Sequence, residues 1–203
     1  MRSYLRSFHL TSAAMAAAIL VLAACGSDSS SDDEDIQEQS EIAYREQMTT
    51  IDDAVAAWRN SLFIDDAYVE AETAANLIVG PNGPDYGDRN GDGTIDGETE
   101  AGILSGLDGT PVGIAETLEP NECIDRDVLG GSWTDPAAEW DKMIVAIDEW
   151  QPDNNTMPTL DSHLMRIVGW ATFTLETDSL GDAHEYADHA KAHVDVSLDA
   201  LNC

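Results

Sequence analysis

Basic residues are scarce in this chain. Its 203 residues include two lysines and seven arginines against 40 acidic residues, which gives a formal net charge of −31. A chain without a basic patch cannot gain the counterion release that drives binding to phosphate backbones. The composition therefore excludes DNA and RNA as partners, and anionic membrane surfaces as direct electrostatic partners. The excess of Asp over Glu is also typical of surfaces adapted to high salt.

Sustained alternation of apolar and polar residues is also missing, which argues against a β-sheet. Apolar residues instead recur every three or four positions. In the clearest case they are Tyr44, Met48, Ile51, Val55, Trp58 and Leu62. This spacing predicts an amphipathic helix. The sequence as a whole indicates an all-α protein, a bundle of four or five helices with an inserted calcium-binding-type loop.

Helix boundaries follow from capping and turn residues. We expect long helices at about 37–62, 66–79, 136–150, 158–175 and 179–201, and short helical turns at 98–107 and 111–118. Asp65 or Asp66 can cap the second helix, and Asp135-Pro136 has the pattern of a helix start. The five tryptophans lie mainly on apolar stripes, which places them in the core. Trp133 lies in a loop and is expected to be available for binding.

The N-terminal 24 residues have the pattern of an export signal. Arg2 and Arg6 precede an apolar run that is too short to span a bilayer. Leu22-Ala23-Ala24-Cys25 resembles the lipobox of bacterial lipoproteins, in which the peptidase cuts before the Cys and the thiol carries the lipid. The resemblance implies a protein anchored to the membrane at Cys25. It also implies a location in the bacterial cell envelope, at an outer membrane or the cell surface, facing the periplasm or the exterior.

Residues 25–35 are rich in Ser and Asp and contain no large apolar side chain. Such a segment cannot bury enough surface to offset the entropy of ordering, so we predict an acidic tether. The folded domain is then expected over residues 36–203.

Two further cysteines, Cys123 and Cys203, remain after Cys25 is assigned to the lipid. An even pair in an oxidising compartment predicts a disulfide. The spacing offers no Cys-x-x-Cys motif, which favours a structural role over a redox role.

The most informative segment is the acidic loop within residues 85–100. Oxygen-bearing side chains stand at loop positions one, three, five and nine, and a glycine at position six allows a sharp turn. The spacing resembles the calcium loop of EF-hand and dockerin proteins. Carried over by position, the ligands would be the side chains of Asp88, Asn90, Asp92 and Asp96 and the backbone carbonyl of Thr94.

Position eight of this loop is Ile95, which we expect to pack on the core, and position twelve, normally a bidentate Glu, is Thr99. Glu98 or Glu100 would have to supply the missing carboxylate if the exit of the loop differs by one residue. Without that ligand we expect weak Ca²⁺ binding, with a Kd on the order of 10⁻⁴ to 10⁻³ M.

A second candidate site is formed by histidines. His189 and His193 are four residues apart on one helical face, and His163 on the preceding helix could add a third imidazole. This pattern is compatible with a transition-metal site, although histidines at the margin of a core face are common without one.

Recognised catalytic motifs are not found: there is no phosphate-binding Gly-rich loop, no Gly-x-Ser-x-Gly and no His-Glu-x-x-His. We therefore expect a protein that is not an enzyme. The leading hypothesis is a lipid-anchored, calcium-stabilised binding or scaffolding module with an unknown protein or small-molecule partner. The alternative is a periplasmic or surface transition-metal-binding protein. The stretch Asn76-Leu77-Ile78 with Gly83-Pro84-Asp85-Tyr86-Gly87-Asp88 is also weakly similar to helical domains of exported bacterial proteins, which implies no particular activity.

Overall fold

The structure is a computed structural model that describes residues 31–151, 157 and 159–203. It is all-α, as the sequence predicts, and no strand occurs in these residues. The α-helices are α1 (Ser31–Arg59), α2 (Ile64–Val79), α3 (Pro136–Asp148), α4 (His163–Glu176) and α5 (Leu180–Asp199). Three short helical segments add to them: η1 (Ile114–Thr117), the π-helical η2 (Ile124–Leu129) and η3 (Ala200–Asn202).

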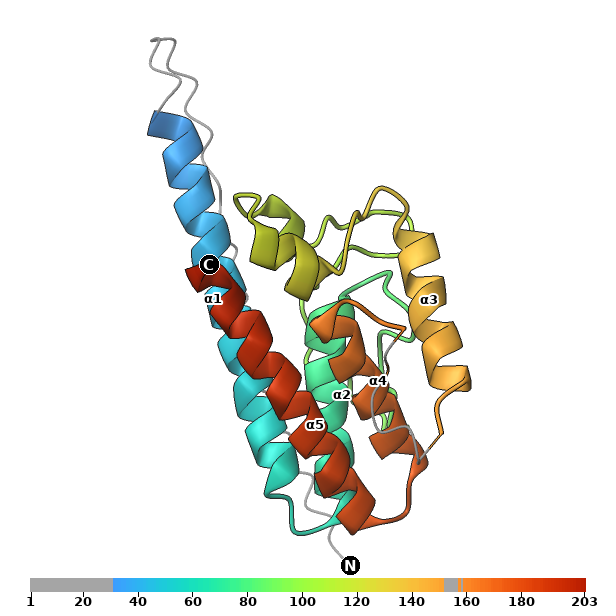
Figure 1. Cartoon of the computed structure of the whole chain (residues 1–203). Coiled ribbons are helices and arrows are strands. Elements are labelled where there is room, and N and C mark those ends of the chain that lie inside the picture. Colours follow the sequence, from blue (N-terminus) through green and yellow to red (C-terminus); the bar gives the residue numbers. More distant parts are fainter. Residues whose placement is uncertain (1–30, 152–156, 158) are drawn as a thin grey trace, which may run out of the picture.

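Four of the helices form the core of the fold. α1 packs on α2, α2 on α4, α4 on α5, and α5 back on α1, so that these helices enclose a common interior (Figure 1). α3 packs against α4 at the edge of this bundle. Small residues on α2, including Ala67, Ala71 and Ala74, are fully buried and allow neighbouring helices to approach closely.

The first helix is longer than predicted at its N-terminus and shorter at its C-terminus. It begins at Ser31, so the last five residues of the predicted tether are helical. Its first turns project beyond the rest of the bundle (Figure 1), and Tyr44 is the first fully buried residue from Asp35 onward. The predicted signal, Cys25 and the tether as far as residue 30 lie outside the described residues.

Capping explains most of the other helix starts. Asp135 accepts a hydrogen bond from Ala138 N, with Pro136 in the first turn, which confirms the predicted start of α3. Ser162 and Ser179 cap α4 and α5 in the same way. α4 therefore begins at His163, later than the predicted residue 158. Asp65 and Asp66 lie in the first turn of α2 and do not form its cap.

Two predictions from local pattern are wrong. Residues 98–107 form turns and bends rather than helix, because their backbone bonds to other segments. Ile103 N and Leu104 N donate to carbonyls of α2, for example. Trp133 is only 6% exposed. Its indole N–H donates to Leu129 O, and its ring packs edge-on against Trp140, so it belongs to the core.

Among the described residues, no helix is both long enough and apolar enough to span a bilayer.

Candidate metal centre

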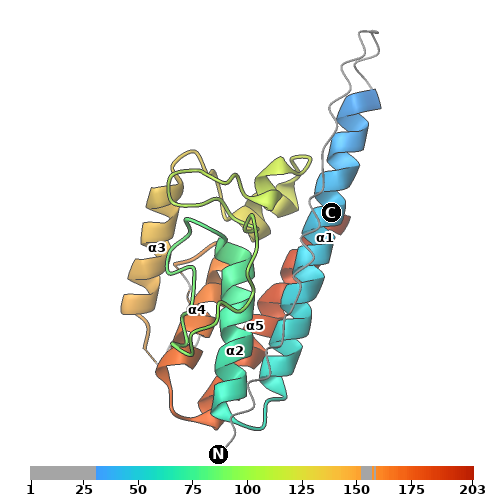
Figure 2. The ribbon, with the colours of Figure 1, turned by 180° about the vertical axis from the view of Figure 1, so that it is seen from behind.

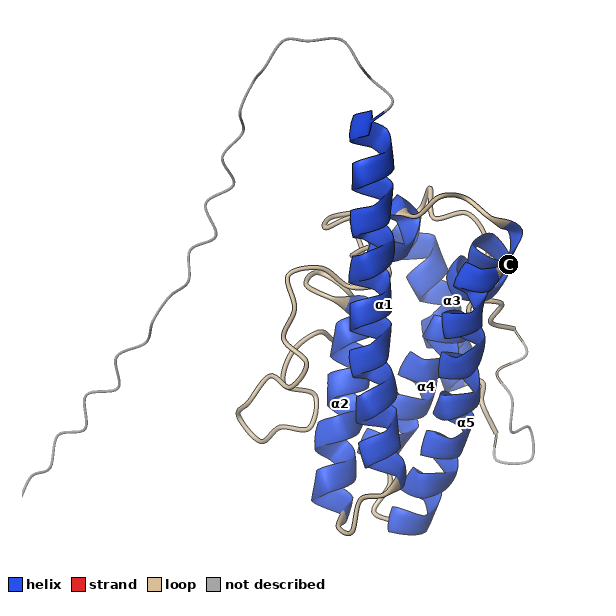
Figure 3. Cartoon of the chain, turned by 90° about the vertical axis from the view of Figure 1, so that its left-hand side faces the viewer, coloured by secondary structure: helices blue, strands red, loops and turns tan. Residues whose placement is uncertain are grey.

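The acidic loop lies along one side of α2 (Figures 2 and 3). Its side chains fold back on its own backbone. Asp88 accepts hydrogen bonds from Gly91 N at 2.8 Å and from Gly93 N at 2.9 Å. Gly93 has a φ of +94°, a conformation that favours glycine, which accounts for the glycine at position six.

The next two loop ligands repeat this arrangement over a shorter span. Asn90 Oδ1 accepts from Asp92 N at 2.9 Å, and Asp92 Oδ1 accepts from Thr94 N at 2.7 Å. Three successive side-chain turns therefore curl residues 88–94 tightly, and they keep the oxygens of positions one, three and five inside the same short loop.

A buried carboxylate on α2 holds both ends of this loop. Glu72 is 0% exposed, and its Oε2 accepts from Arg89 N at 2.9 Å and from Asn90 N at 2.8 Å. Its Oε1 accepts from Asp96 N at 2.9 Å. Since Glu72 bonds to the start and to the end of the loop, it fixes the loop opening to the helix.

Asn76, one turn further along α2, adds a second connection. Its side-chain amide, also 0% exposed, donates to Gly87 O at 2.8 Å and to Asp96 O at 2.7 Å. Its Oδ1 accepts from Gly87 N at 3.2 Å. The loop approaches α2 so closely at Gly97 that a Cβ there would lie 2.5 Å from Thr73 O. We name Glu72 and Asn76 the α2 clamp.

Two carboxylates near the exit of the loop repel other acids. Asp96 Oδ2 is buried without a hydrogen-bond partner. Burial, and then the charges of Asp92 and Asp88, raise the pKa of Asp96. Burial, and then the charges of Asp96 and Asp66, raise the pKa of Glu70 on α2. Negative charge therefore gathers around Asp96 and Glu70, whereas the guanidinium of Arg89 acts on Asp85 and Glu72.

The predicted residues at the exit of the loop are placed less favourably for binding an ion or anchoring the loop. Thr99 bonds with its backbone to the Tyr86 hydroxyl and with its own hydroxyl to Ala101 O. Glu98 and Glu100 on either side of it are exposed. Ile95 is 43% exposed, so the prediction that it packs on the core is wrong. The loop is anchored by the hydrogen bonds of the α2 clamp instead.

The acidic side chains of the loop do not converge on a single ion position in this structure. Within the described ranges, no three His, Cys, Asp or Glu side chains are close enough together to hold an ion as they stand. Next to the loop lies a groove of about 410 Å³, lined by Asp85, Tyr86, Gly87, Asp88, Arg89, Thr172, Leu175 and Glu176.

The histidines of the alternative site are divided between two surroundings. His163 Nδ1 and His193 Nδ1 are 2.9 Å apart. The ring of His189 stacks on Trp170, with centroids 4.5 Å apart. Of the predicted set, only His163 and His193 are therefore in direct contact. His184 lies elsewhere on α5, with its Nε2 3.0 Å from Ser61 O.

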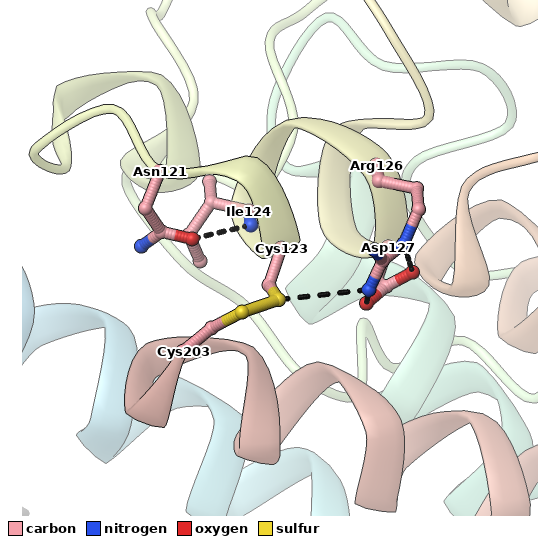
Figure 4. The surroundings of a disulfide bond; sticks show 6 residues. All are labelled: Asn121, Cys123, Ile124, Arg126, Asp127 and Cys203. Carbon is pink, nitrogen blue, oxygen red and sulfur yellow. Dashed lines mark hydrogen bonds and ion pairs between the residues drawn. A yellow bond between two sulfur atoms is a disulfide. The ribbon is translucent and has the colours of Figure 1, made fainter.

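The predicted disulfide is present. Cys123, directly before η2, is bonded to Cys203, with 6.0 Å between their Cα atoms (Figure 4). Beside it, Arg126 reaches the Cys123 sulfur at 3.5 Å and forms an ion pair with Asp127 at 2.6 Å. The bond joins the end of α5 to the segment that precedes α3.

In comparisons with known proteins, the chain matches no family model, no curated protein and no solved structure.

Proposed function

We propose that this protein is a lipid-anchored binding or scaffolding module of the bacterial cell envelope whose acidic loop binds Ca²⁺. The observation that carries the calcium proposal is the loop held by the α2 clamp, with the unpartnered Asp96 oxygen beside it. A preformed loop lowers the entropy cost of binding, and unpaired carboxylate charge supplies the attraction.

The chemistry of the loop fits Ca²⁺ in particular. Its donors are carboxylate, amide and backbone carbonyl oxygens, the hard ligands that calcium accepts in flexible arrangements of six to eight. Asp88, Asn90, Asp92 and Asp96 supply side-chain oxygens and Thr94 its carbonyl. Without a cation, mutual repulsion keeps the carboxylates apart, and an ion would draw them together.

We propose that Glu70 replaces the carboxylate missing at position twelve. The backbone N–H of Thr99 donates a hydrogen bond to the Tyr86 hydroxyl, and its side-chain hydroxyl donates to Ala101 O. Its side chain is therefore already engaged with a residue that follows the loop. Glu70 lies close enough to the exit of the loop for Asp96 to raise its pKa. A ligand from α2 would connect the ion directly to the helical bundle.

Ca²⁺ is expected to stabilise the chain from residue 26 onward against heat. A ligand that binds only the folded state adds roughly 1.4 kcal/mol at ten times its Kd, which raises the melting temperature by a few degrees. Asp92→Ala and Glu70→Gln should remove this increment. The measurement is a thermal melt in chelator and then in millimolar Ca²⁺, at constant ionic strength because salt screens an acidic chain.

Glu46→Ala is the matched control, since it removes an exposed acid on α1 that is not among the candidate ligands. It should leave the calcium increment intact. Equal shifts with Ca²⁺ and with a monovalent salt of the same ionic strength, in wild type and Asp92→Ala alike, would refute calcium binding by this loop.

The anchoring part of the proposal is supported by the lipobox-like sequence that ends at Cys25. We expect Cys25→Ala to leave the protein unanchored, because an acyl chain is the only membrane attachment that the proposal invokes. Fractionation of cells that express each version measures this. Recovery of the Ala variant in the membrane fraction at the wild-type level would contradict the assignment.

The binding role is supported by the groove beside the loop. Asp88 belongs to both the candidate ion site and the groove wall. Binding of Ca²⁺ would neutralise part of the negative charge that a partner meets there, so the ion would control what the groove accepts. A partner that co-purifies with the anchored protein in Ca²⁺, and is released by chelator, would identify this ligand.

A further inference from the structure

Two imidazoles join neighbouring helices at the disulfide end of the bundle. His163 is the first residue of α4, and His193 lies in the second half of α5. Their Nδ1 atoms are 2.9 Å apart, and their rings meet edge-on with centroids 4.9 Å apart. Both side chains are partly buried.

We propose that the His163–His193 pair is an acid-sensitive latch, which holds α4 to α5 when the imidazoles are neutral and releases this end of the bundle when both are protonated.

The latch follows from which imidazole nitrogens carry a hydrogen in the neutral and the protonated ring. An N–H···N bond needs one Nδ1 that carries a hydrogen and one that offers a lone pair. A first proton can enter at Nε2 of the donor ring and leave the bond in place. A second must occupy the accepting Nδ1, which would set two N–H groups and two positive charges against each other. Release therefore requires two protons.

The charged groups around the pair come from three elements. Arg166 on α4, Arg126 on η2 and His189 on α5 oppose positive charge on the rings, and Asp127 on η2 favours it. Asp127 is already paired with Arg126, which offsets much of its charge. The two guanidinium groups also oppose binding of a divalent cation by the pair.

Burial is the largest influence on the pair. It lowers the pKa of both histidines. The charge of Arg166 lowers the pKa of His163 further, and His163 and Arg166 help to bring the pKa of His193 to about 3. The rings take up protons near their ordinary pKa of about 6.5 once they separate. The latch is therefore fully effective above about pH 6.5 and weakens as the pH falls toward the folded-state values.

The disulfide sets how far the opened end can move. Cys203 follows η3 at the end of α5 and is bonded to Cys123 next to η2. The opening should therefore remain local, confined to the first turn of α4 and the last turns of α5. Arg126, Asp127 and Arg166 also line a groove of about 730 Å³, which would change shape with it.

Hydrogen exchange on the full mature chain in non-ionic detergent and constant Ca²⁺ tests the latch. Protection factors of amides around His163 and His193 should fall at least tenfold between about pH 7 and about pH 5, since each proton bound only by the open state changes the equilibrium about tenfold per pH unit. In His193→Gln the fall should be clearly smaller, because only His163 remains to take up a proton. Protection factors correct for the intrinsic pH dependence of exchange.

His184→Gln is the matched control, because it removes another α5 imidazole that contacts Ser61 instead. It should retain the wild-type fall. Should His193→Gln fold poorly, His163→Gln tests the same bond from the other helix. The latch is overturned if wild type and both latch variants lose protection equally, or if wild type loses none.

Discussion

Glu72→Gln is expected to lower the free energy of unfolding by about 3–5 kcal/mol. The fully buried carboxylate accepts three backbone N–H groups, from Arg89, Asn90 and Asp96. Glutamine would turn an NH₂ group toward at least one of them and leave buried donors unsatisfied, each at a cost of roughly 1–3 kcal/mol. Urea unfolding in chelator measures the loss without any contribution from Ca²⁺.

Glu70→Gln is a sharp control for this experiment. It makes the same chemical change two residues away on the same helix, at a half-buried carboxylate whose pKa is raised by neighbouring acids. Without Ca²⁺ it should unfold at the wild-type urea concentration or slightly above it, because it relieves repulsion. An effect of Glu72→Gln as small as that of Glu70→Gln would show that the α2 clamp is not needed for stability.

Replacing both Cys123 and Cys203 with serine is expected to cost roughly 4 kcal/mol. The bond closes a loop across a sequence separation of 80 residues. In the chain-entropy model, a link over such a distance strongly restricts the unfolded chain. The measurement is the urea midpoint of the chain from residue 26, which contains no third cysteine.

Reduction of the wild-type protein provides the comparison. Its midpoint in dithiothreitol should coincide with that of the double serine variant, and reduction should not affect the variant itself. A wild-type midpoint that stays unchanged after complete reduction, verified by alkylation and mass measurement, would contradict a stabilising disulfide.

Local patterns predicted the helices well where periodicity and capping agree. The stripe from Tyr44 to Trp58 is buried as expected, and Asp135 with Pro136 begins α3. The last predicted member of the stripe, Leu62, follows the end of α1 at Arg59 and is 78% exposed, so that part of the prediction is wrong. They failed at residues 98–107, whose backbone bonds to α2 rather than to itself. Such pairing joins segments far apart in sequence, and no local propensity encodes it.

The α2 clamp was missed for the same reason. Glu72 reaches backbone groups between 17 and 24 positions further along the chain, a relation that spacing within the loop does not show. One signal was available: Glu72 and Asn76 are four residues apart on an alanine-rich face, where a polar pair needs buried partners. The loop itself was predicted from its Asp, Asn and Gly residues because its turns are local.

The projecting start of α1 would separate the bundle from an anchor at Cys25. At about 1.5 Å per residue, the stretch from Ser31 to Tyr44 is about 20 Å long. If Cys25 carries a lipid as proposed, this part of α1 would act as a stiff spacer between residue 30 and the bundle. The spacer would keep the bundle, with its acidic loop and groove, away from the residues that precede Ser31.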